Sequence, residues 1–216
     1  MIHVEIATPP TEFEDLVATP GQNALWELVG DPKAAVRPGP KRKVVARTIS
    51  QIPSNALPDY WTRTLPHLCI AYRRICSYLG LLILPGTAVP EVDHFKPKNK
   101  YQHLAYSWEN FRLSCKLTNT FKGTHEDVVD PFEIEADYFG INLFSGHVIA
   151  LSRDTGLRPR LEQTIARLHL NIESTFVQLR LKYIDDYFNG DISFRMLQRD
   201  APFVAREIER QGKKIE

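Results

Sequence analysis

The sequence has few cysteines and no long apolar run. Its three cysteines, Cys69, Cys76 and Cys115, are an odd number and too few to staple 216 residues with disulfides, so we expect a reducing compartment. The longest apolar stretch, about residues 78–84, is far shorter than the ~18 residues that a membrane span needs. The first residues also lack the basic-then-apolar order of a secretory signal. We therefore expect a cytoplasmic protein with no membrane partner.

Net charge is also nearly absent. The chain carries 27 Lys and Arg against 26 Asp and Glu, and 43% of its residues are hydrophobic. This globular composition excludes a disordered or fibrous protein. The balance hides two basic blocks, in residues 31–50 and 91–125, followed by six acids and no base in residues 126–137. The basic blocks are suited to phosphate groups, and a solvated surface is the other interpretation.

Breaks in the pattern divide the chain into three parts. Proline and glycine punctuate the first forty residues, where we expect two short helices over 12–17 and 22–29. The Pro-, Gly- and Arg/Lys-rich stretch 31–43 is typical of a linker. We therefore predict an N-terminal extension with a basic linker in residues 1–54, a central core in 55–151 and a helical region in 152–216.

Apolar spacing predicts the elements of the central part. Apolar residues from Leu65 to Leu79 recur at steps of three and four residues, which predicts one amphipathic helix over 58–79 that stops at Gly80. Residues 89–95 and 111–114 are typical of short strands, and 116–122 of a short helix. Residues 139–151 are typical of a hairpin that turns at Ser145-Gly146.

The last third is predicted to be helical. Apolar residues between Leu161 and Tyr183 follow steps of three and four residues, which indicates one amphipathic helix, or two helices broken near Asn171. A further helix is predicted through Phe194 and Ile208. Such an apolar stripe is more often core than partner surface, because a helix of this length must bury its apolar face.

The polar residues that can do chemistry lie in residues 91–123. Asp93 and His94 are adjacent at the end of an apolar run, Asn110 follows a loop, and Asn119 lies one helical turn before Lys122. Carboxylate and amide oxygens suit a hard cation such as Mg²⁺. Adjacent strand residues point to opposite faces. Asp93 and His94 therefore act either on different sides of a phosphate or from a distorted strand.

This pattern resembles a known family. An Asp-His pair, a loop Asn and a helical Asn-x-x-Lys are similar to HNH endonucleases, whose ββα-metal fold surrounds one divalent ion. The segments Ala71–Tyr78, Val92–Lys98 and Val129–Phe132 resemble, more specifically, the HNH subunit of Septu-type and retron-associated bacterial anti-phage systems. The resemblance covers about residues 55–190. It implies an α+β fold, mostly helical, with a ββα-metal (HNH) core in residues 55–151 and a C-terminal helical region.

The resemblance also implies roles for matching residues. His94 would be the general base that takes a proton from water, and Asp93 and Asn119 would hold Mg²⁺ or Mn²⁺. Asn110 would tie its loop to the strand that carries His94. The catalytic set is thus His94, Asp93, Asn110 and Asn119. Without this resemblance, a helix cap or an exposed amide is the simpler interpretation of both asparagines.

Three lysines near this set are candidates for phosphate contacts. The resemblance implies that Lys122, and more loosely Lys96 and Lys98, bind nucleic acid through flanking phosphates. Solvated surface lysines are the alternative.

One departure from the family concerns zinc. Related proteins commonly carry two Cys-x-x-Cys knuckles, but here the second cysteines are replaced by Leu79 and Thr118. Two thiolates do not close a four-ligand site, so we expect no structural Zn²⁺ and expect Cys76 and Cys115 to be small buried residues. Cys69 and His67 have irregular spacing for replacement ligands.

Two functions of different classes follow. The first is a metal-dependent HNH endonuclease that hydrolyses DNA or RNA as the effector of an anti-phage system. The second is a catalytically weak or inactive interaction subunit of the same type of complex. The resemblance implies an ABC/SMC-type ATPase as partner, and in some systems a retron reverse transcriptase with its RNA–DNA hybrid. We place docking on the acidic stretch 126–137 and on the C-terminal helices.

Overall fold

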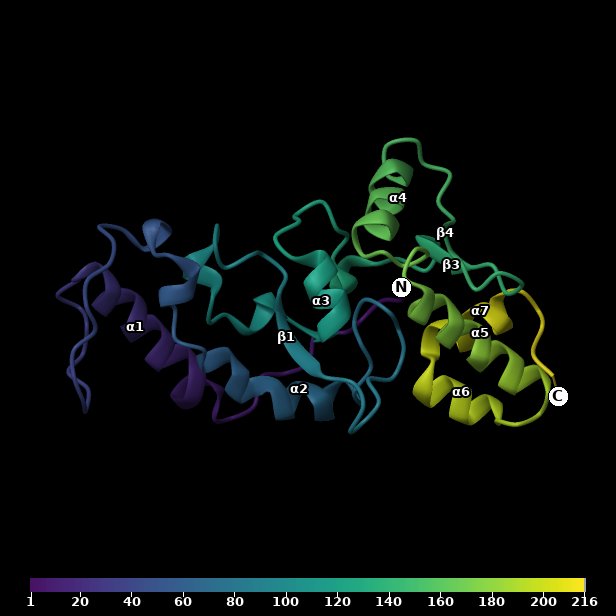
Figure 1. Ribbon diagram of the computed structural model, residues 1–216, viewed down its shortest axis with the longest axis horizontal. Coiled ribbons are helices and arrows are strands. Elements are labelled where there is room, and N and C mark those ends of the chain that lie inside the picture. Colours follow the sequence, from purple (N-terminus) through teal and green to yellow (C-terminus); the bar gives the residue numbers. More distant parts are fainter. Residues whose placement is uncertain (216) are drawn as a thin grey trace.

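A computed structural model describes residues 1–215 as a mixed α+β fold that is mostly helical. It contains two separate two-stranded antiparallel sheets. Figure 1 shows an elongated molecule, with the N-terminal helices at one end and the last helices at the other. The predicted fold class is therefore confirmed.

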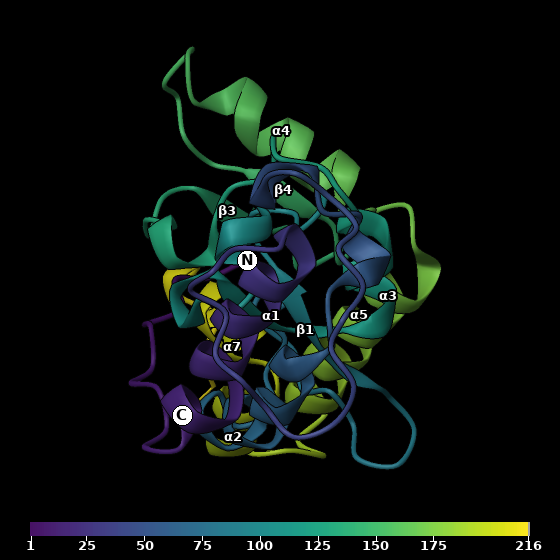
Figure 2. The same cartoon turned by 90° about the vertical axis from the view of Figure 1, so that its left-hand side faces the viewer.

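The N-terminal part is one helix and a long irregular segment. A π-helical turn (Glu14–Ala18) continues into α1 (Thr19–Val29), which ends at Gly30 with a φ of 71°. Residues 31–48 form no helix or strand, and they lie along α1 in Figure 2. Two arginines of this segment, Arg37 and Arg42, both pair with Glu27 of α1. Part of the basic block is therefore neutralised within the chain.

The helix predicted over 58–79 is wrong in its length. A 3₁₀ turn (Tyr60–Thr64) precedes α2, which spans only Leu65–Ala71. Arg73 and Arg74 then take φ values of 49° and 58°, which a right-handed helix does not allow. The chain turns back on itself, and Ile75 pairs with Leu82 in an isolated antiparallel bridge. We call residues 75–82 the knuckle turn.

The centre of the molecule is a hairpin followed by a helix. Strands β1 (Pro90–His94) and β2 (Phe111–Cys115) pair antiparallel, with His94 opposite Phe111. Helix α3 (Lys116–Lys122) follows β2 directly. Figure 1 shows α3 on one side of β1 and α2 on the other. The predicted order of strand, strand and helix is confirmed.

The second sheet is the predicted hairpin. It consists of β3 (Phe139–Ile141) and β4 (Val148–Ala150), and its turn contains Gly146 with a φ of 68°. A Cβ on Gly146 would lie 2.8 Å from Leu181 Cγ, so the close approach of the turn to the helix that bears Leu181 requires glycine.

Residues 152–215 contain four helices, where the sequence predicts two or three. They are α4 (Arg158–Arg167), α5 (Ser174–Phe188), α6 (Phe194–Asp200) and α7 (Pro202–Arg210). The break near Asn171 is confirmed, and it includes His169 with a φ of 51°. The single helix predicted through Phe194 and Ile208 is wrong, because Pro202 cannot continue α6 and begins α7 instead.

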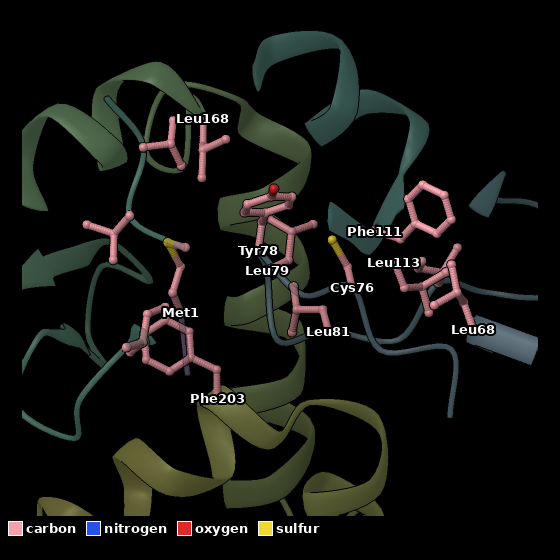
Figure 3. Close-up of a cluster of buried hydrophobic side chains, with 14 of the residues drawn as sticks. Met1, Leu68, Cys76, Tyr78, Leu79, Leu81, Phe111, Leu113, Leu168 and Phe203 are labelled. Atoms are coloured by element: carbon pink, nitrogen blue, oxygen red, sulfur yellow. The ribbon is translucent and has the colours of Figure 1, made fainter. Parts of the chain in front are cut away.

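One apolar core joins these parts. Figure 3 shows the buried side chains of the knuckle turn at the centre of this core. Phe111 and Leu113 of the central hairpin lie on one side of them, and Phe203 of α7 and Met1 lie on the other. The apolar stripe of α4 and α5 contributes to this core, as predicted. Across residues 1–215, the helices are all too short or too polar to cross a bilayer.

Some carboxylates of the acidic stretch 126–137 are paired within the chain, and others are exposed to solvent. Asp130 is buried and its carboxylate accepts from Arg112 Nε at 2.8 Å and Nη2 at 2.6 Å. Asp127 pairs with Arg167. Glu133 and Glu135 remain exposed.

Candidate active site

A cleft of about 480 Å³ opens beside the end of β1. Asp93, His94, Lys98 and Asn119 all line it. The structure therefore brings together four of the residues predicted from the sequence. Asp93 and His94 are neighbours on β1 (Pro90–His94), and both line this cleft, as do the other residues of the strand.

The imidazole of His94 is held by one hydrogen bond and two aromatic rings. Its Nε2 lies 2.9 Å from the backbone carbonyl oxygen of Ala105, and the rings of Trp61 and Phe111 meet it edge-on. A carbonyl oxygen only accepts, so Nε2 carries the proton and Nδ1 keeps its lone pair. Burial lowers the pKa of His94 to about 4. At neutral pH the ring is therefore uncharged and can accept a proton at Nδ1.

Asp93 is buried and receives a hydrogen bond on each carboxylate oxygen. Tyr78 donates its hydroxyl to Oδ2 at 2.5 Å, and Lys122 donates its ammonium to Oδ1 at 3.1 Å. Burial, followed by the neighbouring Asp93, raises the pKa of Tyr78 well above its usual value. Tyr78 therefore stays protonated and remains a donor.

Asn119 lies on α3 with its amide fixed in direction. Its Nδ2 donates to Glu91 Oε2 at 2.7 Å, and Glu91 lies two residues before Asp93 on the same face of β1. No described residue donates a hydrogen bond to Asn119 Oδ1, so this oxygen is the ligand that the amide can offer.

Asn110 is buried, and its side chain bonds only to backbone. Its Oδ1 accepts from Lys96 N at 2.7 Å, and its Nδ2 donates to the carbonyls of Lys96 and Leu104 at 3.0 and 3.1 Å. Leu104 precedes Ala105, whose carbonyl binds His94. This geometry matches the loop-tying role that the resemblance implies for Asn110.

The three lysines differ in where their ammonium groups lie. Lys98 is half-buried in the cleft, with its Nζ 4.0 Å from the centre of the Trp61 ring, and burial lowers its pKa. Lys96 lines a separate cavity beside Asn110.

Lys122 does not have the placement predicted from the sequence. Its side chain is 0% exposed, and its Nζ donates to Asp93 and to the backbone carbonyl of His94 at 3.0 Å. An ammonium group enclosed in this way does not reach a flanking phosphate. We therefore correct its role to a partner of Asp93.

The donor set of the cleft fits a hard cation. Among residues 1–215, no three His, Cys, Asp or Glu side chains cluster to hold a metal, so a cation would rely on Asp93, Asn119 and water. Mg²⁺ commonly binds in this way. A carboxylate has about four acceptor positions, so Asp93 keeps capacity beyond its two hydrogen bonds.

The two degenerate knuckles meet at one place. Cys76 Sγ and Cys115 Sγ lie 4.0 and 2.9 Å from Thr118 Oγ1, and Leu79 is buried. Cys76 is fully buried, as expected, and burial raises its pKa. Cys115 is only partly buried, and the neighbouring Cys76 and Thr118 side chains lower its pKa to about 6. Contrary to the expectation of two buried cysteines, Cys115 is therefore partly exposed.

Sequence reasoning missed three residues of the site: Tyr78, Glu91 and Trp61. A signal existed for Glu91, because alternate strand residues share a face with Asp93. Tyr78 ends the Ala71–Tyr78 segment, to which the sequence assigns no chemical role. Its contact with Asp93 spans 15 residues of sequence, so local pattern does not reveal it. Nothing in the sequence indicates Trp61 as a site residue, since a lone aromatic residue more often packs in the core than lines a functional site.

Comparison with known proteins gives one local match. A stretch of 56 residues, 26% of this chain, is 46% identical to the Septu protein PtuB of Bacillus thuringiensis and spans 22% of that protein. No family model matches the chain. The match supports a relation to the Septu defence family.

Proposed function

We propose that this protein is a metal-dependent nuclease that hydrolyses phosphodiester bonds in nucleic acid during anti-phage defence. The observation that carries the proposal is the convergence of Asp93, His94 and Asn119 on one cleft, with a neutral His94 whose Nδ1 is unprotonated. The resemblance to HNH endonucleases and the local match to a Septu protein support the same interpretation.

The chain's own residues would act in the following way. His94 Nδ1 accepts the proton of a water molecule that attacks phosphorus. Asn110 holds the loop whose Ala105 carbonyl orients the imidazole. Lys98 offers a positive charge to a phosphate inside the cleft. Asp93 and Asn119 would hold Mg²⁺ or Mn²⁺. The bound cation would neutralise the negative charge that develops on the phosphate and on the departing oxygen.

A second candidate is a weak or inactive subunit of a defence complex. The ammonium of Lys122, buried against Asp93, favours it, because this charge competes with a cation for the same carboxylate. Phage plating discriminates the two candidates. Loss of protection in His94→Ala supports the nuclease, and full protection by that variant supports the interaction subunit.

The enzymatic test uses purified protein, alone and with its ATPase partner. Plasmid DNA, single-stranded DNA and tRNA are incubated with Mg²⁺ or Mn²⁺, with EDTA as the control. We expect cleavage of one of these classes that EDTA abolishes. Absence of cleavage under all conditions contradicts the nuclease.

The partner proposal is an ATPase of the ABC/SMC type, joined in some systems by a retron reverse transcriptase. Exposed acids at Glu133 and Glu135 remain the proposed docking charges. Reversing both to Lys should weaken salt-sensitive binding to the ATPase, and unchanged binding contradicts this surface.

A further inference from the structure

The carboxylate of Asp93 is held from two directions by groups that come from different elements. Tyr78 of the knuckle turn reaches Oδ2, and Lys122 at the end of α3 reaches Oδ1. Both side chains are 0% exposed. Since each oxygen has its own donor, the carboxylate cannot rotate without breaking a buried hydrogen bond.

The knuckle turn that carries Tyr78 is itself tightly bound. Cys76 N donates to Leu81 O at 2.9 Å, and Ser77 N donates to Leu113 O of β2 at 2.9 Å. Gly80 takes a φ of 61°, and a Cβ there would lie 2.7 Å from Phe203 Cβ. The turn therefore has one position relative to the hairpin that bears Asp93.

Apolar packing holds the knuckle turn at Leu79, where the resemblance implies a cysteine. Figure 3 shows Cys76, Tyr78, Leu79 and Leu81 entering one apolar cluster. Thr118 of α3 contacts both thiols. Movement of the knuckle turn would thus move the Tyr78 hydroxyl away from Asp93.

We propose that Tyr78 is a positioning residue that orients Asp93 to bind the divalent cation. The inference rests on the proposed function for its cation. Tyr78 and Lys122 each use one acceptor position of the carboxylate, which leaves others for a cation, and Asp93 lines the same cleft as Asn119. Through Tyr78, the knuckle turn thereby contributes to binding of the divalent cation without itself holding a structural Zn²⁺.

The experiment measures Mn²⁺ binding to the full chain by electron paramagnetic resonance of free Mn²⁺, without nucleic acid. Tyr78→Phe should raise the Kd for Mn²⁺ about 10-fold, the lower end of the range for residues that orient a metal ligand. Tyr187→Phe is the matched control, because Tyr187 is also buried and its hydroxyl bonds only to Ile215. It should leave the Kd unchanged, and Asp93→Asn should abolish binding.

A second measurement covers the case in which Tyr78→Phe does not fold. With 3-fluorotyrosine at position 78, the ¹⁹F resonance should shift as Mg²⁺ is added, whereas the same label at position 187 should not respond. An Mn²⁺ Kd equal to that of the wild type in folded Tyr78→Phe overturns the proposal. So does a ¹⁹F signal at position 78 that ignores Mg²⁺, or a wild-type chain that binds no Mn²⁺.

The outcomes separate this inference from the proposed function. If Mn²⁺ binds and Tyr78→Phe weakens it, but no nucleic acid is cut, the nuclease fails and the positioning role stands. If cleavage depends on His94 while Tyr78→Phe binds Mn²⁺ normally, the nuclease stands and the positioning role fails.

Discussion

The imidazole Nε2 of His94 donates to the carbonyl oxygen of Ala105 over 2.9 Å. This contact fixes the tautomer, so the lone pair lies on Nδ1. Burial keeps the ring uncharged at neutral pH, with a pKa of about 4. The ring can thus accept a proton at Nδ1 in the proposed reaction, and the predictions below test the side chains around it.

Asn110→Ala should lower both stability and cleavage. The variant loses three hydrogen bonds to buried or half-buried backbone, at about 1 kcal/mol each, so we expect a loss of about 3 kcal/mol in the free energy of unfolding. Urea denaturation measures it. Asn189→Ala is the control, because Asn189 is exposed at the end of α5. Equal stability of the two variants would refute the loop-tying role.

Cys115 should react with iodoacetamide before the other cysteines. Its pKa of about 6 makes it mostly thiolate at pH 7, whereas burial raises the pKa of Cys69 and Cys76. The alkylation rate of Cys115 should rise with pH and reach half its maximum near pH 6. Peptide mass spectrometry after timed quenching measures each site. Faster labelling of Cys69 at pH 7 is the contradicting result.

Lys98→Ala should weaken nucleic-acid binding more than loss of a lysine outside the cleft. Removing one phosphate contact should reduce the slope of log K against log salt by about one. Fluorescence anisotropy in the His94→Ala background measures binding without cleavage. Lys116→Ala, at an exposed position on α3, is the control. Identical salt slopes for both variants would exclude Lys98 as a phosphate contact.

Glu207→Gln should destabilise the C-terminal region. The Glu207 carboxylate is 0% exposed, accepts from Ile141 N and pairs with Arg206 and Arg210. Burial alone would raise the pKa of Glu207, but the Arg210 and Ile141 hydrogen bonds and the Arg206 charge outweigh it and lower the pKa. We expect a loss of about 2 kcal/mol at pH 7, less than for a fully enclosed pair because both arginines are partly exposed.

The pH dependence of this effect follows from the lowered pKa. The stabilisation is present at neutral pH and is lost as the pH falls through the unfolded and then the folded pKa of Glu207. The difference between wild type and Glu207→Gln in urea should therefore shrink in acid. Glu209→Gln, exposed on the same helix, should differ little from wild type. A pH-independent difference would contradict the charged pairing.

Much of the site could be predicted because its residues lie at the ends of short, regular elements. Asp93 and His94 end a strand and Asn119 lies on a short helix, so local pattern suffices to place them. Lys122 could not be placed in this way. Its ion pair with Asp93 spans 29 residues, and a lysine on a short helix is ordinarily solvated.

The knuckle turn shows a second limit of sequence patterns. Ile75 and Leu79 continue the three- and four-residue spacing of α2, yet they pack from a turn. Apolar spacing reports which side chains are buried together, and it does not distinguish a continued helix from a chain that reverses at Arg73 and Arg74.

The central claim is that His94 performs the proton transfer of a metal-dependent cleavage. Initial cleavage rates of wild type, His94→Ala and His147→Ala, at saturating Mg²⁺ and with the proposed ATPase present, test it most directly. His147 is exposed directly before β4, and its substitution should leave the rate unchanged. We expect His94→Ala to be at least about 100-fold slower, with the fold intact. A His94→Ala rate equal to that of wild type would contradict the account.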